Sequence, residues 1–196
     1  MEGRSKDLQH FLEATSVAFS RHVTDAKGKD SVRRIFAMLE EPGTPSQKGG
    51  TRLPVCGFLS EAVAGARANE SLATMLACFL EIEHRLSWTT RTKHDGSAGP
   101  NFASGHANAM VAGPGGLEDR KDLWLGVTLM APHIRYPDHF HAPEETYLVL
   151  SEGEFRQGEG PWFSPGVGGS FYNPPNIKHA MRSHSTPLLA FWALLV

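Results

Sequence analysis

The sequence has few of the features that mark secreted, membrane-spanning or disulfide-rich proteins. Its 196 residues include two cysteines, Cys56 and Cys78, which form neither a disulfide framework nor a zinc-finger spacing. No run of about 18 apolar residues is present, so we expect no membrane partner. The first residues are charged and then amphipathic, without the apolar core of a signal peptide. Buried thiols in a reducing compartment fit this pattern, and we expect a cytoplasmic protein.

Charge is also nearly balanced, with a net value of −2 at pH 7. A nucleic-acid-binding protein usually carries a basic excess, and the Arg33-Arg34 pair forms no basic stripe. We therefore expect no nucleic-acid partner. Hydrophobic residues make up 40% and charged residues 20%, which favours a packed core in a chain long enough for one domain.

The pattern of apolar residues divides the chain near residue 95. Residues 1–95 are predicted to form a helical N-terminal part, because apolar side chains recur at helical spacing over 8–19, 32–39 and 72–83. The expected N-caps are Asp30 or Ser31 for the second helix and Asn69 or Ser71 for the third.

Residues 96–196 change to short apolar runs that are separated by Gly and Pro turn signals. Such regular spacing is typical of a β-sandwich or barrel. The apolar run 188–196 is predicted to be a buried strand. We expect a mainly β protein, a β-sandwich or barrel with the helical part packed on it as one compact unit.

One segment of the predicted barrel concentrates residues that bind metals. His139, His141, Glu145 and Tyr147 are all odd-numbered, and alternate side chains of a strand share one face. His179 follows a proline-rich turn. Imidazole and carboxylate ligands suit one divalent transition metal, namely Zn, Fe, Mn, Co or Ni. If these polar side chains were buried without a partner, each would lower the stability of the fold by about 1–3 kcal/mol. We expect ordinary structural roles for the other histidines: His10, His22, His84, His94, His106, His133 and His184.

These residues resemble the two motifs of the cupin superfamily. The first motif is matched by His139-x-His141-x3-Glu145, and the second by Gly168-x5-Pro174-x-Asn176-x2-His179. Asn176 stands where the second motif has an inner glycine, and Asn tolerates the left-handed backbone better than most residues. His133 stands at a glycine position before the first motif. The resemblance implies a cupin-type fold, a single antiparallel β-barrel of the jelly-roll kind with the α-helical N-terminal part packed on it.

A narrower resemblance covers Tyr136-x2-His139-x-His141-x3-Glu145-x-Tyr147 together with His179. The pattern is similar to the cupin lyases that split dimethylsulfoniopropionate into dimethyl sulfide and acrylate, most of all the short Q-type members. That family implies metal ligands at His141, Glu145 and His179, with Tyr147 close to or on the metal. It also implies that Tyr136 and His139 line the pocket, although the first histidine of the pair is itself a ligand in many other cupins.

The reaction implied by the resemblance fits these residue types. The substrate is a small zwitterion, with a carboxylate at one end and a sulfonium at the other. A Lewis-acidic metal spreads the charge that develops when a base removes the proton next to the carboxylate. A nearby cation lowers a tyrosine pKa, so Tyr147 is the first choice of base, and Tyr136, on the loop leading into the site, is the second. Aromatic rings attract a sulfonium, and the candidates are Phe140, Trp162, Phe171, Tyr172 and Trp192.

Two other functions stay open on the sequence alone. Another metal-dependent cupin enzyme, such as a dioxygenase or an isomerase, has a compatible ligand set. A non-catalytic cupin that binds or senses a small molecule is the other. The N-terminal part shows no helix-turn-helix of the kind that sensor cupins carry. The sequence does not decide the oligomeric state, for which a homodimer is considered.

Overall fold

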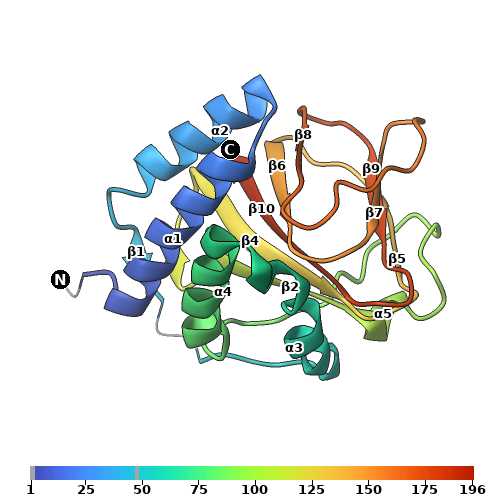
Figure 1. Cartoon of the computed structure of the whole chain (residues 1–196), viewed down its shortest axis with the longest axis horizontal. Coiled ribbons are helices and arrows are strands. Elements are labelled where there is room, and N and C mark those ends of the chain that lie inside the picture. The colour runs from blue at the N-terminus through green and yellow to red at the C-terminus, as the bar shows by residue number, and fades with distance from the viewer. Residues whose placement is uncertain (1–2, 47–48) are drawn as a thin grey trace.

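Helices from the N-terminal half pack on one side of two facing β-sheets (Figure 1). The computed structural model describes residues 3–46 and 49–196. The helical elements in chain order are α1 (Lys6–His22), α2 (Ala26–Met38), η1 (Pro54–Phe58), α3 (Leu59–Ala62), η2 (Gly65–Ala68), α4 (Glu70–Glu83) and α5 (Phe102–Gly105). The strands are β1 (Thr44–Pro45), β2 (His106–Ala112), β3 (Glu118–Asp119), β4 (Leu123–Met130), β5 (Arg135–His139), β6 (Glu144–Val149), β7 (Glu154–Gln157), β8 (Ser170–Asn173), β9 (His179–Arg182) and β10 (Leu188–Leu195).

Side-chain caps define the starts of the long helices. The Asn69 side chain accepts the backbone N–H groups of Ser71 and Leu72, so the expected cap of α4 is confirmed. The expected cap of α2 was wrong, because Asp25 caps that helix and accepts the N–H of Gly28 at 2.9 Å. The apolar periodicity begins late, since the first turn of α2 is polar, and this hid the true start.

The larger sheet has seven strands in the order β1-β3-β2-β4-β10-β6-β8. The smaller sheet has three strands in the order β5-β9-β7. Strand β10 pairs antiparallel with β4 on one side and β6 on the other, so the predicted buried strand at the end of the chain is confirmed. The two sheets enclose the expected antiparallel barrel.

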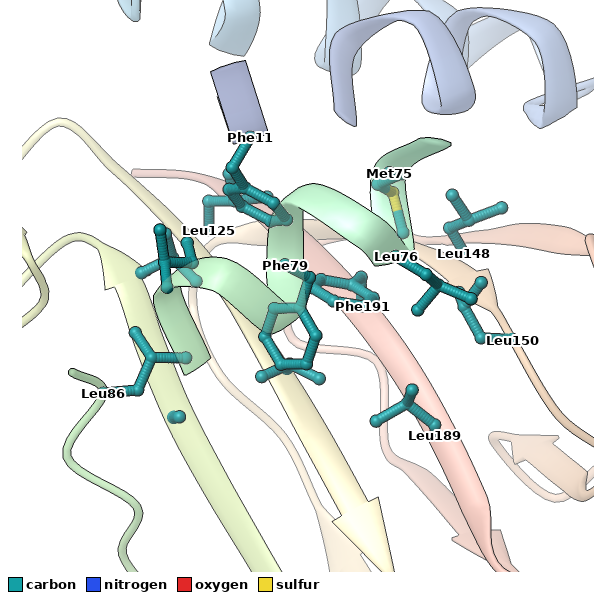
Figure 2. Packing of buried hydrophobic residues seen from close by; sticks show 14 of the residues in the cluster. Phe11, Met75, Leu76, Phe79, Leu86, Leu125, Leu148, Leu150, Leu189 and Phe191 are labelled. Carbon is teal, nitrogen blue, oxygen red and sulfur yellow. The ribbon is translucent and has the colours of Figure 1, made fainter. Parts of the chain in front are cut away.

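The large sheet has an apolar core on each face. Phe11 of α1 and Phe79 of α4 pack against Phe191 of β10, at centroid distances of 5.9 and 5.0 Å (Figure 2). On the other face Tyr147 and Val149 belong to a second cluster, inside the barrel, with Met181 and Phe155 of the small sheet among its members. Alternation along β6 therefore turns Glu145 and Tyr147 inward, as the sequence predicted.

Among the helices of the described residues, none is long and apolar enough to cross a membrane.

Candidate active site

The barrel interior brings together two histidines and a glutamate from separate parts of the chain. Within residues 3–46 and 49–196, one group of at least three potential metal-ligand side chains converges, namely His141, Glu145 and His179. One ligand atom from each lies within 4.8 Å of the others. Glu145 comes from β6, His179 begins β9, and His141 follows the end of β5. The pairing of β5 with β9 brings the two histidine segments together, because His139 and His179 are cross-strand partners.

Backbone carbonyl groups orient each imidazole of the site in the same way. The Nδ1 atom of His141 hydrogen-bonds the carbonyl of Pro143 at 2.8 Å. The Nδ1 atom of His179 makes the equivalent bond to Ile177 at 2.9 Å. Since a carbonyl only accepts, Nδ1 carries the hydrogen and Nε2 of each neutral ring presents a lone pair. This is the ring orientation that a metal-binding histidine requires.

Both Nε2 atoms are buried and make no hydrogen bond. Each lies 3.3 Å from Oε2 of Glu145. Burial by itself would raise the pKa of Glu145, but the two imidazoles that face the carboxylate lower it below its usual range, so the carboxyl group is ionised. Burial likewise opposes protonation of His141, but Glu145 raises its pKa. Two buried lone pairs facing a carboxylate would leave polar atoms unsatisfied without a shared cation, so these residues fit a divalent metal.

A second layer of amides fixes the glutamate. Asn173, which is fully buried, donates from Nδ2 to Oε2 of Glu145 at 2.9 Å. Gln157 in turn donates to Oδ1 of Asn173 at 2.6 Å. These two bonds hold the carboxylate in one orientation, which is the usual function of outer groups around a metal site.

His139 lies beside this group without joining it. Its ring stacks at a tilt on His179 with centroids 4.0 Å apart, and its Nδ1 atom bonds the carbonyl of Pro137 at 2.9 Å. Burial first, and then the charge of His179, lowers the pKa of His139 to about 3. His139 is therefore a neutral imidazole in the wall of the site.

The two candidate tyrosines sit on opposite sheets. Tyr136 was expected on a loop, but it lies within β5 and pairs with Met181. The misassignment came from Pro137, whose missing N–H is tolerated because β5 is an edge strand. Burial raises the pKa of Tyr136, while a hydrogen bond from Asn108 opposes that effect. Burial and the Glu145 carboxylate raise the pKa of Tyr147 well above its usual value.

Both tyrosines, His139, His141 and Glu145 line a cavity of about 300 Å³. A larger hollow of about 740 Å³ lies along α1 and α2, and its lining includes none of the site residues. A volume near 300 Å³ suits a small molecule. The cavity wall comprises Thr89, Thr90, Arg91, Asn108, Met110, Trp124, Thr128, Tyr136, His139, His141, Glu145, Tyr147, Met181, Trp192 and Leu194.

Of the five aromatic candidates, two face the barrel interior. Phe171 stacks on Tyr147 with centroids 4.9 Å apart, and Trp192 lines the cavity. The other three lie elsewhere. Phe140 is 68% exposed, Trp162 packs on the guanidinium groups of three arginines, and the Tyr172 hydroxyl donates to Glu144 at 2.5 Å.

Several cavity residues carry no signal that the sequence alone could reveal. Arg91, Asn108 and Thr128 belong to no motif. Only the pairing of β2 with β4 brings Asn108 and Thr128 to the cavity, and Arg91 comes from the segment before β2. His106 keeps the structural role expected for it, since its ring stacks on Phe102 and its Nε2 atom accepts the backbone N–H of Arg91 at 2.9 Å.

Comparison with known proteins identifies the family. A family model described as dimethylsulfoniopropionate lyase matches residues 27–190. The chain belongs to the dimethylsulfoniopropionate lyase family. A relative, dimethylsulfoniopropionate lyase DddQ of Ruegeria pomeroyi, is 31% identical over 157 residues, which cover 79% of this chain and 76% of that protein. Membership of the dimethylsulfoniopropionate lyase family confirms the expected class of enzyme, a carbon–sulfur lyase.

Solved structures show the same fold. The crystal structure of DMSP lyase DddQ from Ruegeria pomeroyi DSS-3 has a TM-score of 0.77 at 23% identity, covering 98% of this chain and 93% of that one. A structure described with the DMSP lyases RdDddP and RnDddQII also has a TM-score of 0.77, at 22% identity and with coverage of 97% and 92%. The expected cupin-type barrel with an α-helical N-terminal part is thereby confirmed for this member of the family.

Proposed function

We propose that this protein is a metal-dependent lyase that cleaves dimethylsulfoniopropionate into dimethyl sulfide and acrylate by β-elimination. Family membership and the 31% identical relative support the substrate. The observation that carries the metal dependence is the pair of buried, unbonded Nε2 atoms of His141 and His179, which both face Oε2 of Glu145.

His141, Glu145 and His179 are the proposed ligands of one divalent metal, with Tyr147 as a further ligand or close neighbour. A metal bound there supplies a Lewis acid for the substrate carboxylate. Which of Zn, Fe, Mn, Co or Ni is native stays a prediction, as do the cytoplasmic location and a homodimer. His139, as a neutral ring beside His179, is proposed to shape the pocket and to orient the reacting groups.

The chemical step needs one proton acceptor. An ionised tyrosine, Tyr147 or Tyr136, would take the proton from the carbon next to the substrate carboxylate. Burial raises the pKa of both phenols, and the charge of a bound divalent metal would lower it. The electron pair of that C–H bond forms the C=C bond of acrylate, and the pair of the C–S bond leaves with sulfur. The sulfonium thus departs as neutral dimethyl sulfide, and no acid is required.

The cavity wall also offers complementary groups for the two ends of the zwitterion. Arg91 lines the cavity, so its guanidinium puts a positive charge in the cavity wall. A carboxylate is the natural partner of such a group. The rings of Trp124 and Trp192 offer π-faces to the sulfonium.

Headspace gas chromatography tests this proposal. Purified protein is incubated with dimethylsulfoniopropionate and each of Zn²⁺, Fe²⁺, Mn²⁺, Co²⁺ and Ni²⁺ in turn, with a chelator control. We expect dimethyl sulfide and an equal amount of acrylate, both dependent on metal. Folded, metal-loaded protein that releases no dimethyl sulfide with any of the five would refute the proposed reaction and direct the search to oxygen-dependent chemistry.

A further inference from the structure

A line of hydrogen bonds leads from Trp192 to the hydroxyl of Tyr136. The indole N–H of Trp192 donates to Oγ1 of Thr128 at 3.0 Å. The Thr128 hydroxyl donates to Oδ1 of Asn108 at 2.6 Å. The Nδ2 atom of Asn108 then donates to the Tyr136 oxygen at 3.1 Å. The four residues come from β10, β4, β2 and β5, so the line crosses from the large sheet to the small one.

The direction of every bond follows from the chemistry of Trp192. An indole N–H can only donate, so Thr128 must accept there and has its own hydrogen left to donate. That hydrogen occupies the carbonyl oxygen of Asn108, which turns the amide nitrogen to Tyr136. If the Asn108 amide were flipped, Thr128 Oγ1 would face two donors, the Trp192 indole N–H and the Asn108 Nδ2 group. The threonine hydrogen would then have to point away from Asn108. The Tyr136 oxygen therefore accepts a hydrogen bond from the Asn108 amide.

Burial and strand register hold the line in place. Asn108 and Thr128 are cross-strand partners, and Thr128 is 2% exposed. The Tyr136 side chain is 5% exposed, with its ring edge-on to Phe102 at 5.0 Å. Inside a barrel such bonds are stronger than in water, and each one polarises the next.

We propose that Trp192, Thr128 and Asn108 are positioning residues that hold the Tyr136 oxygen as a hydrogen-bond acceptor in the wall of the cavity. Its kinetic consequence rests on the proposed lyase function with Tyr136, rather than Tyr147, as the proton acceptor. An N–H aimed at the oxygen stabilises the phenolate more than the phenol, so the line favours the form of Tyr136 that accepts a proton. The same hydrogen bonds connect the Trp192 ring, which lines the cavity, with the Tyr136 hydroxyl group.

The decisive variant is Thr128→Val, which keeps the shape of the side chain and removes its hydroxyl. The matched control is Thr146→Val, because Thr146 is equally buried and its hydroxyl has no hydrogen-bond partner. Thr128→Ser restores the hydroxyl and serves as the rescue variant. Asn108→Asp, of the same size as the native residue, replaces the N–H that faces Tyr136 with an acceptor oxygen. Melting temperatures of all four verify that they fold.

The first readout is independent of activity. The chain holds three tyrosines, so ¹³Cζ-tyrosine labelling gives three signals, which the single Tyr→Phe variants assign. We expect Thr128→Val and Asn108→Asp to shift the Tyr136 signal, while Thr146→Val and Thr128→Ser leave it in place. A Tyr136 signal that does not move in either Thr128→Val or Asn108→Asp would overturn the proposal. This holds even if the wild-type protein releases no dimethyl sulfide.

The second readout is the split between kcat and KM for release of dimethyl sulfide. We expect Thr128→Val to lower kcat about tenfold, with KM within about twofold, because Asn108 is then no longer held in the orientation that donates to the Tyr136 oxygen. Thr128→Ser should regain most of that loss. A raised KM with unchanged kcat would mean that Thr128 contacts substrate and would overturn the positioning role. A wild type without activity would instead refute the proposed function, and the labelled tyrosine signals would still decide whether the line exists.

Discussion

The ring of Trp192 lies directly across Gly126, its cross-strand partner on β4. A Cβ atom at Gly126 would come within 2.2 Å of the indole Cη2 atom and 2.6 Å of the carbonyl oxygen of Ala109. The Trp192 indole can therefore occupy this position only because Gly126 has no side chain. In the same row across the sheet, Trp192 is paired with Tyr147, and Tyr147 with Phe171.

Gly126→Ala is the first prediction. The added methyl group forces the Trp192 ring off its position, so we expect a loss of about 1–3 kcal/mol in unfolding free energy and a loss of lyase activity. Urea unfolding and the rate of dimethyl sulfide release measure the two effects. Gly57→Ala is the matched control, because nothing lies within 4 Å of the Cβ position there. Full activity and stability in Gly126→Ala would show that the ring is not confined by the glycine.

Much of the site was predictable because its residues follow local rules. Strand alternation put Glu145 and Tyr147 on one face, and β6 carries both of them inward. The second motif required a left-handed turn, and Asn176 indeed has a φ of 61°. Such features depend on a few neighbouring residues and can be recognised without knowing the tertiary structure.

The rest of the site depends on contacts between distant segments. Asn108 and Thr128 become partners only through the pairing of β2 with β4. Asn173 reaches Glu145 only because β8 pairs with β6. An isolated Asn or Thr in a strand has no periodicity or spacing that separates a site residue from a surface residue. Only tertiary structure distinguishes them.

A prediction on stability follows from His133. Like Asn176, it stands at a glycine position of the resembled motifs, and it has a φ of 60°. A left-handed backbone costs a β-carbon residue about 1–2 kcal/mol, more than the entropy that glycine loses on folding. We expect His133→Gly to raise the unfolding free energy by roughly 0.5–1 kcal/mol, and Asn176→Gly to raise it less. Urea titration measures both, and a destabilised His133→Gly would mean that its side chain makes an important contact.

The outer amides lead to a prediction on metal affinity. Without the Nδ2 donor of Asn173, the Glu145 carboxylate is free to turn, so we expect Asn173→Ala to weaken metal binding about 10–100-fold. Competition with a chromophoric chelator gives the dissociation constant. Ser170→Ala is a control on the same strand, because its hydroxyl donates to the carbonyl of His22 on the helical side, at 2.8 Å. Equal affinity in the wild type and Asn173→Ala would contradict a metal at Glu145.

A pH-dependent contribution to stability is expected from Glu118. Its carboxylate accepts from Arg4 at 2.6 Å and from Arg120 at 3.1 Å. Burial by itself would raise the pKa of Glu118, but these arginines and the backbone N–H of Gly43 hold the pKa below its usual range. A lowered folded-state pKa means that the stabilisation is complete above the unfolded value of about 4.3 and is lost as the pH falls through the folded value.

Urea unfolding between about pH 6 and pH 3 tests this dependence. Stability should fall with decreasing pH in the wild type, and Glu118→Gln should be less stable at pH 6 with a shallower fall. The control is Asp30→Asn, since the side chains of Asp30 and Arg33 are 58% and 71% exposed and such surface pairs contribute little. The same slope in Glu118→Gln and the wild type would assign the acid sensitivity to other carboxyl groups.

Substitutions in the site can distinguish loss of metal binding from loss of proton transfer. Tyr147→Phe should abolish turnover and leave the metal bound, because His141, Glu145 and His179 remain. His141→Ala should lose both. Tyr172→Phe, which removes a hydroxyl bonded to Glu144 outside the cavity, is the matched control and should keep full activity. Metal content by mass spectrometry and release of dimethyl sulfide give the two readouts. Retained turnover in Tyr147→Phe would move the proton acceptor to Tyr136, and turnover in both Phe variants would contradict a tyrosine base.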